Sequence, residues 1–168
     1  MAKLNGIEIK SLKSFRGHEG EPLFQGNIYY HGKKLGFWTQ DAHGGICDEF
    51  LFDRKILEKE VGRFAKSFLV EEKYSSFADL EMLLTSLLTL ILDEKDYKKA
   101  LKKGYSAIVQ ANDGYHYNYY MTREVDKSKI QNSSYYKNFL QEFEKTAFKN
   151  RKIEVKIYTS LDDFILSV

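Results

Sequence analysis

The chain has 168 residues, about the length of one domain, and 43% of them are hydrophobic and 30% charged. This composition excludes a disordered chain, a collagen-like chain and a disulfide scaffold, and the single cysteine, Cys47, excludes an intramolecular disulfide. The net charge of +2 is too small to predict a polyanionic partner. With no secretory leader and no apolar run long enough to span a bilayer, we expect a cytoplasmic protein without membrane contact.

The N-terminal part of the chain predicts strands joined by tight turns. Residues 3–15 alternate loosely between apolar and polar side chains, which predicts a first strand. Residues 23–30 and 33–40 predict a β-hairpin across His31-Gly32, because glycine adopts positive φ freely and histidine is among the residues enriched there. Residues 46–52 predict one more strand.

After Asp53, a candidate N-cap, the spacing of apolar residues changes to three and four. This spacing predicts an amphipathic helix over residues 54–72. A serine at position 75 or 76 can begin the next helix, whose apolar residues over 82–92 exceed a single stripe. We therefore expect that helix at the centre of the core or in a homodimer contact. It continues or restarts as far as Lys103, and Gly104 suits its C′ position.

The C-terminal part predicts a hairpin, a helix and a strand. Residues 105–111 and 115–122 flank Asp113-Gly114, a strong hairpin signal because a type I′ turn needs positive φ twice. Ser133 or Ser134 can cap a helix through about residue 149, and residues 152–158 alternate as a strand. Ser160 can cap a last short turn, with Phe164 and Ile165 packing inward.

The segregation of strands from helices predicts the α+β fold class, with an antiparallel sheet from two β-hairpins plus further strands, packed by three main helices. No repeat, low-complexity segment or linker divides the chain. We expect a single compact domain over 1–168, with two packed lobes, 1–103 and 104–168, as the alternative.

Residues able to perform catalysis or bind metal are present but not arranged for it. His18 and His43 lie in glycine-containing loops near carboxylates, yet no two ligands share a spacing on one helix or strand. Cys47 and His43 are the one local pair of nucleophile and base, without a third group to orient them. Phosphate-loop and dinucleotide motifs are absent from the sequence. We therefore predict no catalytic residues, no metal, no cofactor and no enzymatic activity.

The first hairpin contains the only tryptophan. A two-residue turn at His31-Gly32 pairs Ile28 with Leu35, which places Trp38 on the face opposite these apolar residues. Trp38 is then either covered by another part of the chain or an anchor for a partner, where tryptophan is enriched. Under the second interpretation the candidate partner-binding residues on this hairpin are Trp38, Lys34 and Gln40.

The second hairpin carries alternating tyrosines. A two-residue turn at Asp113-Gly114 pairs Ile108 with Tyr119, so that Tyr115, Tyr117 and Tyr119 share a face while small residues occupy the other. If the small-residue face packs against a helix, the three tyrosines are displayed for stacking or protein binding. If not, they belong to the core. Both interpretations stay open.

Lysines near the end of the long helix form the candidate nucleic-acid surface. They follow acidic residues at 93, 94 and 96, an order that also complements the helix dipole. The residues of this alternative site are Lys98, Lys99, Lys102 and Lys103.

A family resemblance is carried by residues 17–27 (GHEGEPLFQGN), 32–38 (GKKLGFW) and 41–45 (DAHGG). This run resembles small proteins carried by phages and other mobile elements of bacteria, some of which are anti-defence factors such as anti-CRISPR inhibitors. The resemblance covers about the first third of the chain and carries no catalytic motif, so no functional residue is transferred from it. It implies stoichiometric binding to a bacterial nuclease, or to its nucleic acid, in the cytoplasm of a bacterial host.

From these observations we expect a non-enzymatic binding protein that inhibits a bacterial defence nuclease complex, with a CRISPR effector among the candidate targets. The alternative is a nucleic-acid-binding accessory protein that uses a basic, tyrosine-rich hairpin surface. Salt dependence separates the two, because direct phosphate binding weakens steeply with added salt.

Overall fold

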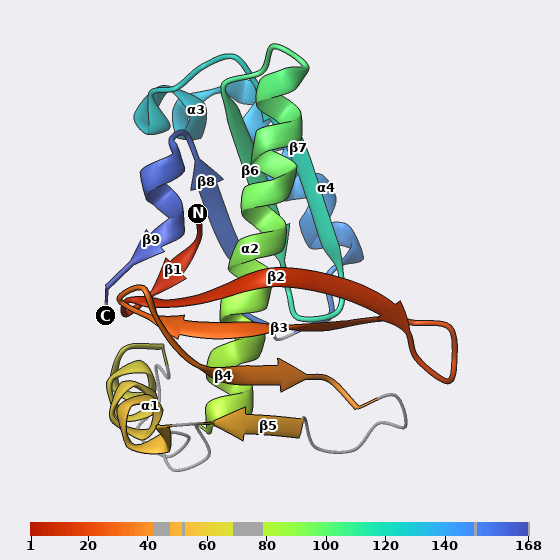
Figure 1. Ribbon diagram of the computed structural model, residues 1–168. Coiled ribbons are helices and arrows are strands. Elements are labelled where there is room, and N and C mark those ends of the chain that lie inside the picture. The colour runs from red at the N-terminus through yellow and green to blue at the C-terminus, as the bar shows by residue number, and fades with distance from the viewer. Residues whose placement is uncertain (42–47, 52, 69–78, 150, 168) are drawn as a thin grey trace. The chain divides into compact units, whose positions relative to one another are not determined.

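The computed structural model describes residues 1–41, 48–51, 53–68, 79–149 and 151–167 and confirms the α+β fold class (Figure 1). The chain divides into two compact units. Unit 1 comprises Met1–Leu92 and Phe164–Val168, and unit 2 comprises Asp93–Asp163. The boundary falls inside a helix, not after Lys103, where the two-lobe alternative placed it. No helix of the described ranges is long and apolar enough to cross a membrane.

Unit 1 is built on a six-stranded sheet in the order β5-β4-β3-β2-β1-β9. Neighbouring strands are antiparallel, except that β1 and β9 are parallel. The two predicted hairpins therefore do not share one sheet, since the second belongs to unit 2. The strands of this sheet are β1 (Lys3–Leu4), β2 (Ile7–Arg16), β3 (Pro22–Tyr30), β4 (Lys33–Thr39), β5 (Asp48–Leu51) and β9 (Ile165–Leu166).

The predicted first strand is two strands, β1 and β2, joined by a tight turn. Asn5 and Gly6 have φ values of +52° and +78°, and Leu4 pairs with Ile7 across them. Asn-Gly is the favoured dipeptide for such a turn, so the sequence carried the signal. The prediction of a continuous strand over 3–15 was wrong because that signal was not used.

The β3–β4 hairpin turns at His31-Gly32, as predicted, with φ values of +45° and +84°. Its register shifts between Ile28 and Tyr29, so that Ile28 pairs with Gly36 and not with Leu35. The extra residue, Leu35, forms a β-bulge. Every residue of β4 after the bulge therefore lies on the face opposite to the predicted one.

Trp38 lies on the core face because of this bulge. It pairs with Gly26, two residues from Ile28, and none of its surface is exposed. A Cβ on Gly26, the residue that pairs with Trp38, would collide with the Ile9 side chain. The predicted pairing, and with it the polar surroundings expected for Trp38, was wrong.

Two helices belong wholly or partly to unit 1. α1 spans Arg54–Phe68, within the predicted helix, whose remaining residues lie outside the described ranges. α2 spans Leu80–Lys102 without interruption. The Asp79 carboxylate accepts a hydrogen bond from the Met82 N–H at 2.8 Å and caps α2. Apolar residues of its first half, among them Leu83, Leu84 and Leu87, are fully buried, as expected for a helix at the centre of a core.

Unit 2 contains a three-stranded antiparallel sheet in the order β7-β6-β8, with the second half of α2 on one face and α3 and α4 on the other (Figure 1). The core beneath α3 and α4 is formed by Ala107, Val109 and Ile130. The elements are β6 (Ala107–Asn112), β7 (Tyr117–Thr122), α3 (Lys127–Asn132), α4 (Ser134–Thr146) and β8 (Glu154–Tyr158).

Helix ends in unit 2 follow the capping rules. Gly104 has a φ of +82° just after α2, and the Tyr105 N–H donates to the Ala100 carbonyl at 3.1 Å, as in a Schellman motif. Ser133 caps α4 by accepting from the Tyr136 N–H at 3.1 Å. α3 was not predicted, although Asp126 caps it.

A short 3₁₀ helix, η2 (Leu161–Phe164), follows β8 and leads into β9. The Ser160 hydroxyl accepts from the Asp162 N–H at 3.2 Å, so the predicted cap is confirmed. Phe164 is fully buried, as expected, but Ile165 is 49% exposed. The expectation that Ile165 packs inward was therefore wrong, and the partly buried residue of the edge strand β9 is Leu166.

Candidate functional site

The partner-binding residues predicted on the first hairpin do not form an exposed patch. Trp38 is inside the core and unavailable to a partner, which leaves cover by its own chain as the correct interpretation. Gln40 is partly buried, and its Oε1 accepts from the Phe24 N–H at 2.9 Å. Lys34 alone of the three is exposed. The correction follows from the β-bulge, which turned Trp38 inward.

The second hairpin also has a different register, but its faces are those predicted. Ile108 pairs with Met121 and Gln110 with Tyr119, so the connection between Asn112 and Tyr117 is a four-residue loop and not a two-residue turn. The pairing is shifted by two residues from the predicted one. Because side chains alternate between faces with a period of two, each residue stays on its predicted face. The small-residue face packs against α3 and α4, as the interpretation with displayed tyrosines required.

Two tyrosines of this face, Tyr117 and Tyr119, form what we call the tyrosine strip. β7 is an edge strand, and the two side chains are 48% and 43% exposed. Their ring centroids lie 5.9 Å apart. Burial of part of the Tyr117 ring raises the pKa of its phenol, and the nearby Asp93 and Asp96 carboxylates raise it further.

The buried Asp93 carboxylate links α2 to the sheet that carries the tyrosine strip. Asp93 on α2 accepts from Gln110 Nε2 at 3.2 Å and from the Tyr158 hydroxyl at 2.8 Å. Burial raises the pKa of Asp93, and the hydrogen bonds from Tyr158 and Gln110 oppose that rise. These bonds join α2 to β6 and β8, so the face that carries the strip is held in place by more than apolar contact.

The predicted lysine surface is partly neutralised by its own helix. Lys98 Nζ lies 2.8 Å from a Glu94 oxygen, and Lys99 Nζ lies 2.8 Å from Asp96 Oδ1. Lys102 and Lys103 are exposed, and neither forms an ion pair with a carboxylate of the described ranges. Two of the four predicted cations thus have intrahelical partners, which is the dipole-complementing arrangement.

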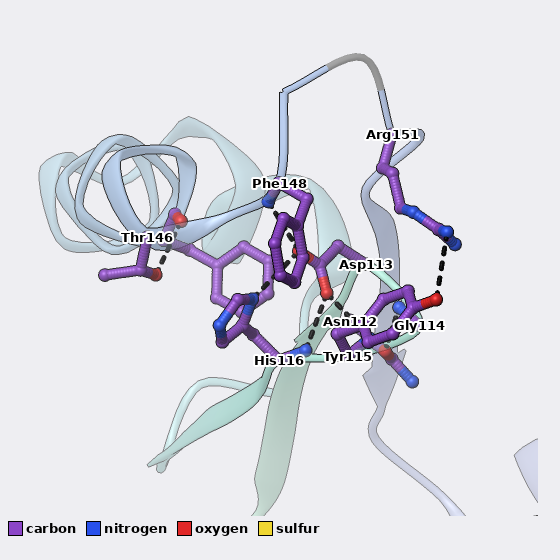
Figure 2. Close-up of polar contacts among 9 residues, drawn as sticks. Asn112, Asp113, Gly114, Tyr115, His116, Thr146, Phe148 and Arg151 are labelled. Carbon is purple, nitrogen blue, oxygen red and sulfur yellow. Dashed lines mark hydrogen bonds and ion pairs between the residues drawn. The ribbon is translucent and has the colours of Figure 1, made fainter.

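Tyr115 is separate from the strip and belongs to a second group of residues at the end of the hairpin (Figure 2). The group is organised by Asp113, which follows β6. Asp113 Oδ1 accepts from the N–H groups of Tyr115 at 2.9 Å and His116 at 2.6 Å. Its Oδ2 accepts from the Phe148 N–H at 2.9 Å and lies 3.1 Å from His116 Nδ1. The backbone N–H of His116, followed by those of Phe148 and Tyr115, holds the pKa of Asp113 well below its usual range.

Aromatic and basic side chains surround this carboxylate (Figure 2). The Phe148 ring lies 5.1 Å from both the Tyr115 ring and the His116 ring. The Arg151 guanidinium lies 4.3 Å from the Tyr115 ring centroid, and its Nη2 donates to the Tyr115 hydroxyl at 3.2 Å. We call Asp113, Tyr115, His116, Phe148 and Arg151 the tip cluster.

Phe148 and Arg151 were not identified from the sequence. Phe148 falls within the helix predicted through about residue 149, yet α4 ends at Thr146 and Phe148 is 54% exposed. Its backbone bond to Asp113 joins positions 35 residues apart. A contact of that separation leaves no local pattern, so only the structure could reveal it.

A pocket of about 240 Å³ lies elsewhere in unit 2, lined by Tyr120, Thr122, Glu124, Lys129, Ile130, Ser133 and Tyr135. Its polar groups have local structural roles. Ser133 caps α4, and Glu124 Oε1 accepts from the N–H groups of Val125 and Asp126 at 3.0 Å each. Nothing in these bonds orients a nucleophile or an acid–base pair.

The described ranges contain no group of three or more His, Cys, Asp or Glu side chains that could hold a metal ion. His18 is exposed in its loop, while His43 and Cys47 lie outside the described residues.

No protein-family model, curated protein or solved structure matches this chain.

Proposed function

We propose that this chain is a non-enzymatic binding protein that recognises a protein partner through the tyrosine strip. We further propose that it is a phage or mobile-element inhibitor of a bacterial defence nuclease complex, acting by stoichiometric binding. The observation that supports binding is the exposure of two adjacent tyrosines on an edge strand. The resemblance of the first third of the chain supports the choice of target.

Tyrosine suits a protein interface because it offers a large rigid ring and a polar hydroxyl at little entropic cost. Tyr117 and Tyr119 stand on a strand whose sheet is packed on both faces, so their backbone is already ordered before a partner arrives. A preordered aromatic pair loses less conformational freedom on binding than a mobile one.

The charges beside the strip favour a protein over a nucleic acid. Asp93 and Asp96 are close enough to raise the pKa of Tyr117, and the nearby Lys99 is paired with Asp96. A phosphate approaching the strip would meet carboxylates and a cation that already has a partner. A protein can instead cover the rings and hydrogen-bond to their hydroxyls.

Affinity capture from a bacterial lysate tests this proposal, with the double variant Tyr117→Ala/Tyr119→Ala beside the wild type. Tyr135→Ala is the matched control, because Tyr135 is also in unit 2, on α4, and is 63% exposed. The captured partner should bind wild type and control in a one-to-one complex. Its affinity for the double variant should fall by about 30-fold or more, the size expected for a hot spot of about 2 kcal/mol.

The nuclease activity of the captured complex tests the choice of target. One equivalent of the wild-type chain should abolish cleavage, whereas one equivalent of the double variant should leave the nuclease active. Capture of the same partner by wild type and double variant with equal affinity contradicts the role of the strip. A partner without nuclease activity contradicts the inhibitor proposal.

A further inference from the structure

We infer that the tip cluster, with Lys149 and Lys152, is a stacking site for single-stranded nucleic acid. The site lies outside the tyrosine strip and goes beyond the proposed protein binding. It also differs from the lysine surface predicted on α2, because its residues come from the β6–β7 loop and from the segment between α4 and β8.

The first argument is the direction in which charge is displayed. The segments 112–118 and 146–152 contain one carboxylate, that of Asp113, and three permanent cations, Lys149, Arg151 and Lys152. The Asp113 side chain has no exposed surface, and its oxygens face four nitrogen atoms of the cluster. The negative charge is therefore turned inward.

The cations of these segments, in contrast, are exposed to solvent. Lys149, Arg151 and Lys152 are exposed, and none forms an ion pair with a carboxylate of the described ranges. This contrasts with Lys98 and Lys99 on α2, which acidic residues of their own helix neutralise. Cations that no carboxylate of the described ranges neutralises, next to an inward-facing carboxylate, are available to phosphate oxygens.

The second argument is the geometry of the rings. Tyr115 is 66% exposed and Phe148 is 54% exposed, although each already packs edge-on against the other. Arg151 lies over the Tyr115 ring, so a delocalised cation and two aromatic rings are presented together. Bases of any identity stack on such groups, and guanidinium groups add cation–π attraction.

The third argument is that the site is ordered in advance. Asp113 accepts from Tyr115 and His116 in one segment and from Phe148 in the other. The Arg151 bond to the Tyr115 hydroxyl joins the same two segments. The rings are therefore held at fixed distances before a ligand binds, which lowers the entropic cost of binding.

A single strand fits this site better than a duplex. The bases of a duplex are stacked on each other, so exposed protein rings cannot reach their faces, whereas an unpaired strand offers those faces freely. Three cations can neutralise about three phosphates, so the site covers a short length of strand.

Fluorescence anisotropy with a labelled oligothymidylate of about ten nucleotides tests the inference. The wild type should bind at low salt, and log K should fall with log salt with a slope of about −2, from about 0.7 for each of three phosphates. Tyr115→Ala and Phe148→Ala should each weaken binding by about fivefold or more at an unchanged slope. Arg151→Ala should weaken binding and reduce the slope by about 0.7, while Arg151→Lys should retain the slope.

Three controls separate this site from others. Tyr119→Ala should leave oligothymidylate binding unchanged, which keeps the result independent of the tyrosine strip. Lys102→Ala, which removes an exposed cation on α2, should also have no effect. An abasic strand of equal length should bind at least about fivefold more weakly, because it offers phosphates without stacking surfaces.

The inference is overturned if the wild type does not bind the strand at low salt, or if Tyr115→Ala and Phe148→Ala bind as tightly as wild type while their far-UV circular dichroism is unchanged. Equal affinity for the abasic strand also overturns it, since charge alone would then explain binding. Tighter binding to a duplex, or equal affinity for thymidine monophosphate, overturns the assignment to a single strand.

Discussion

Both hairpins of this protein differ in register from the predicted pairing, but the consequences for the faces of their side chains differ. In β3–β4 a bulge shifts the register by one residue and moves Trp38 from the predicted outer face into the core. In β6–β7 a longer loop shifts the register by two residues, and Tyr117 and Tyr119 stay on the predicted face. Because side chains alternate with a period of two, an odd shift exchanges the faces and an even shift conserves them.

This difference separates the two aromatic groups in their exposure to solvent. The first hairpin uses its tryptophan for the stability of unit 1, and the second displays its tyrosines. A binding surface predicted from alternation therefore depends on whether the number of extra residues in a hairpin is odd or even, not on the exact partners of each residue.

The largest expected effect that tests this comparison is that of Trp38→Ala. Removing a fully buried indole leaves a cavity, so the free energy of unfolding should fall by about 3–5 kcal/mol. Urea unfolding followed by circular dichroism measures the change. Trp38→Phe should recover a large part of the loss, because Trp38 Nε1 is buried and has no hydrogen-bond partner among the described residues, so the substitution breaks no hydrogen bond there. A loss below about 1 kcal/mol for Trp38→Ala would contradict the inward position of Trp38.

The second test addresses the residue opposite Trp38. A Cβ at Gly26 would lie 2.4 Å from Ile9 Cγ2 and 3.2 Å from the Lys10 carbonyl oxygen, so Gly26→Ala should overpack the core and cost about 1–3 kcal/mol. Thermal and urea unfolding provide the measurement. Gly62→Ala in α1 is the matched control, since a Cβ there meets no described atom within 4 Å apart from the backbone of its own helix and should stabilise the protein by about 0.5–1 kcal/mol. Equal stability of both variants would refute the predicted crowding at Gly26.

The third test concerns acid sensitivity at the end of the second hairpin. The pKa of Asp113 is lowered in the folded state, so its contribution to stability is complete above the ordinary aspartate pKa of about 4 and is lost as the pH falls through the lowered value. Asp113→Asn should therefore be less stable than wild type at neutral pH, and the difference should shrink in strong acid. Urea midpoints from about pH 7 to about pH 2 provide the comparison. A difference that stays constant over this range would show that the Asp113 charge does not contribute.

The smallest expected effect is that of Tyr119→Ala on stability. The side chain is 43% exposed on an edge strand, so the free energy of unfolding should change by no more than about 0.5 kcal/mol. The same urea titration used for Trp38→Ala gives this value. A loss of several kcal/mol would place Tyr119 in the core and remove the contrast between the hairpins.

Much of the fold follows from local rules in the sequence. The helices α1 and α2, the cap at Ser133 and the glycine after α2 were predicted because each depends on neighbours within one or two turns. The Asn5-Gly6 turn and the Asp126 cap follow the same local rules, so the sequence also contains the signals for them, although they were not predicted. β9, with two residues, is too short to produce a periodic signal.

The remaining features depend on contacts between distant residues. The bulge makes Ile28 pair with Gly36. No pattern of residues within β3 or β4 predicts this pairing. The tip cluster needs Asp113 to meet Phe148, and β7, α3 and α4 lie between these two residues in the sequence. Alternation alone predicted that Tyr117 and Tyr119 share a face but left open whether that face is displayed, whereas the tip cluster depended on tertiary structure.

Because β9 pairs with β1, the sheet of unit 1 can be completed only after unit 2 has been synthesised. All of unit 2 is translated between the strands that begin the sheet of unit 1 and the strand that completes it. Until β9 emerges from the ribosome, β1 is the outer strand of that sheet and its hydrogen-bonding edge is open, a template for association with other nascent chains. Ile165 and Leu166 thus cover the edge of β1 and become the outer strand themselves, and the interval before they do so is set by the time needed to translate the whole inserted unit.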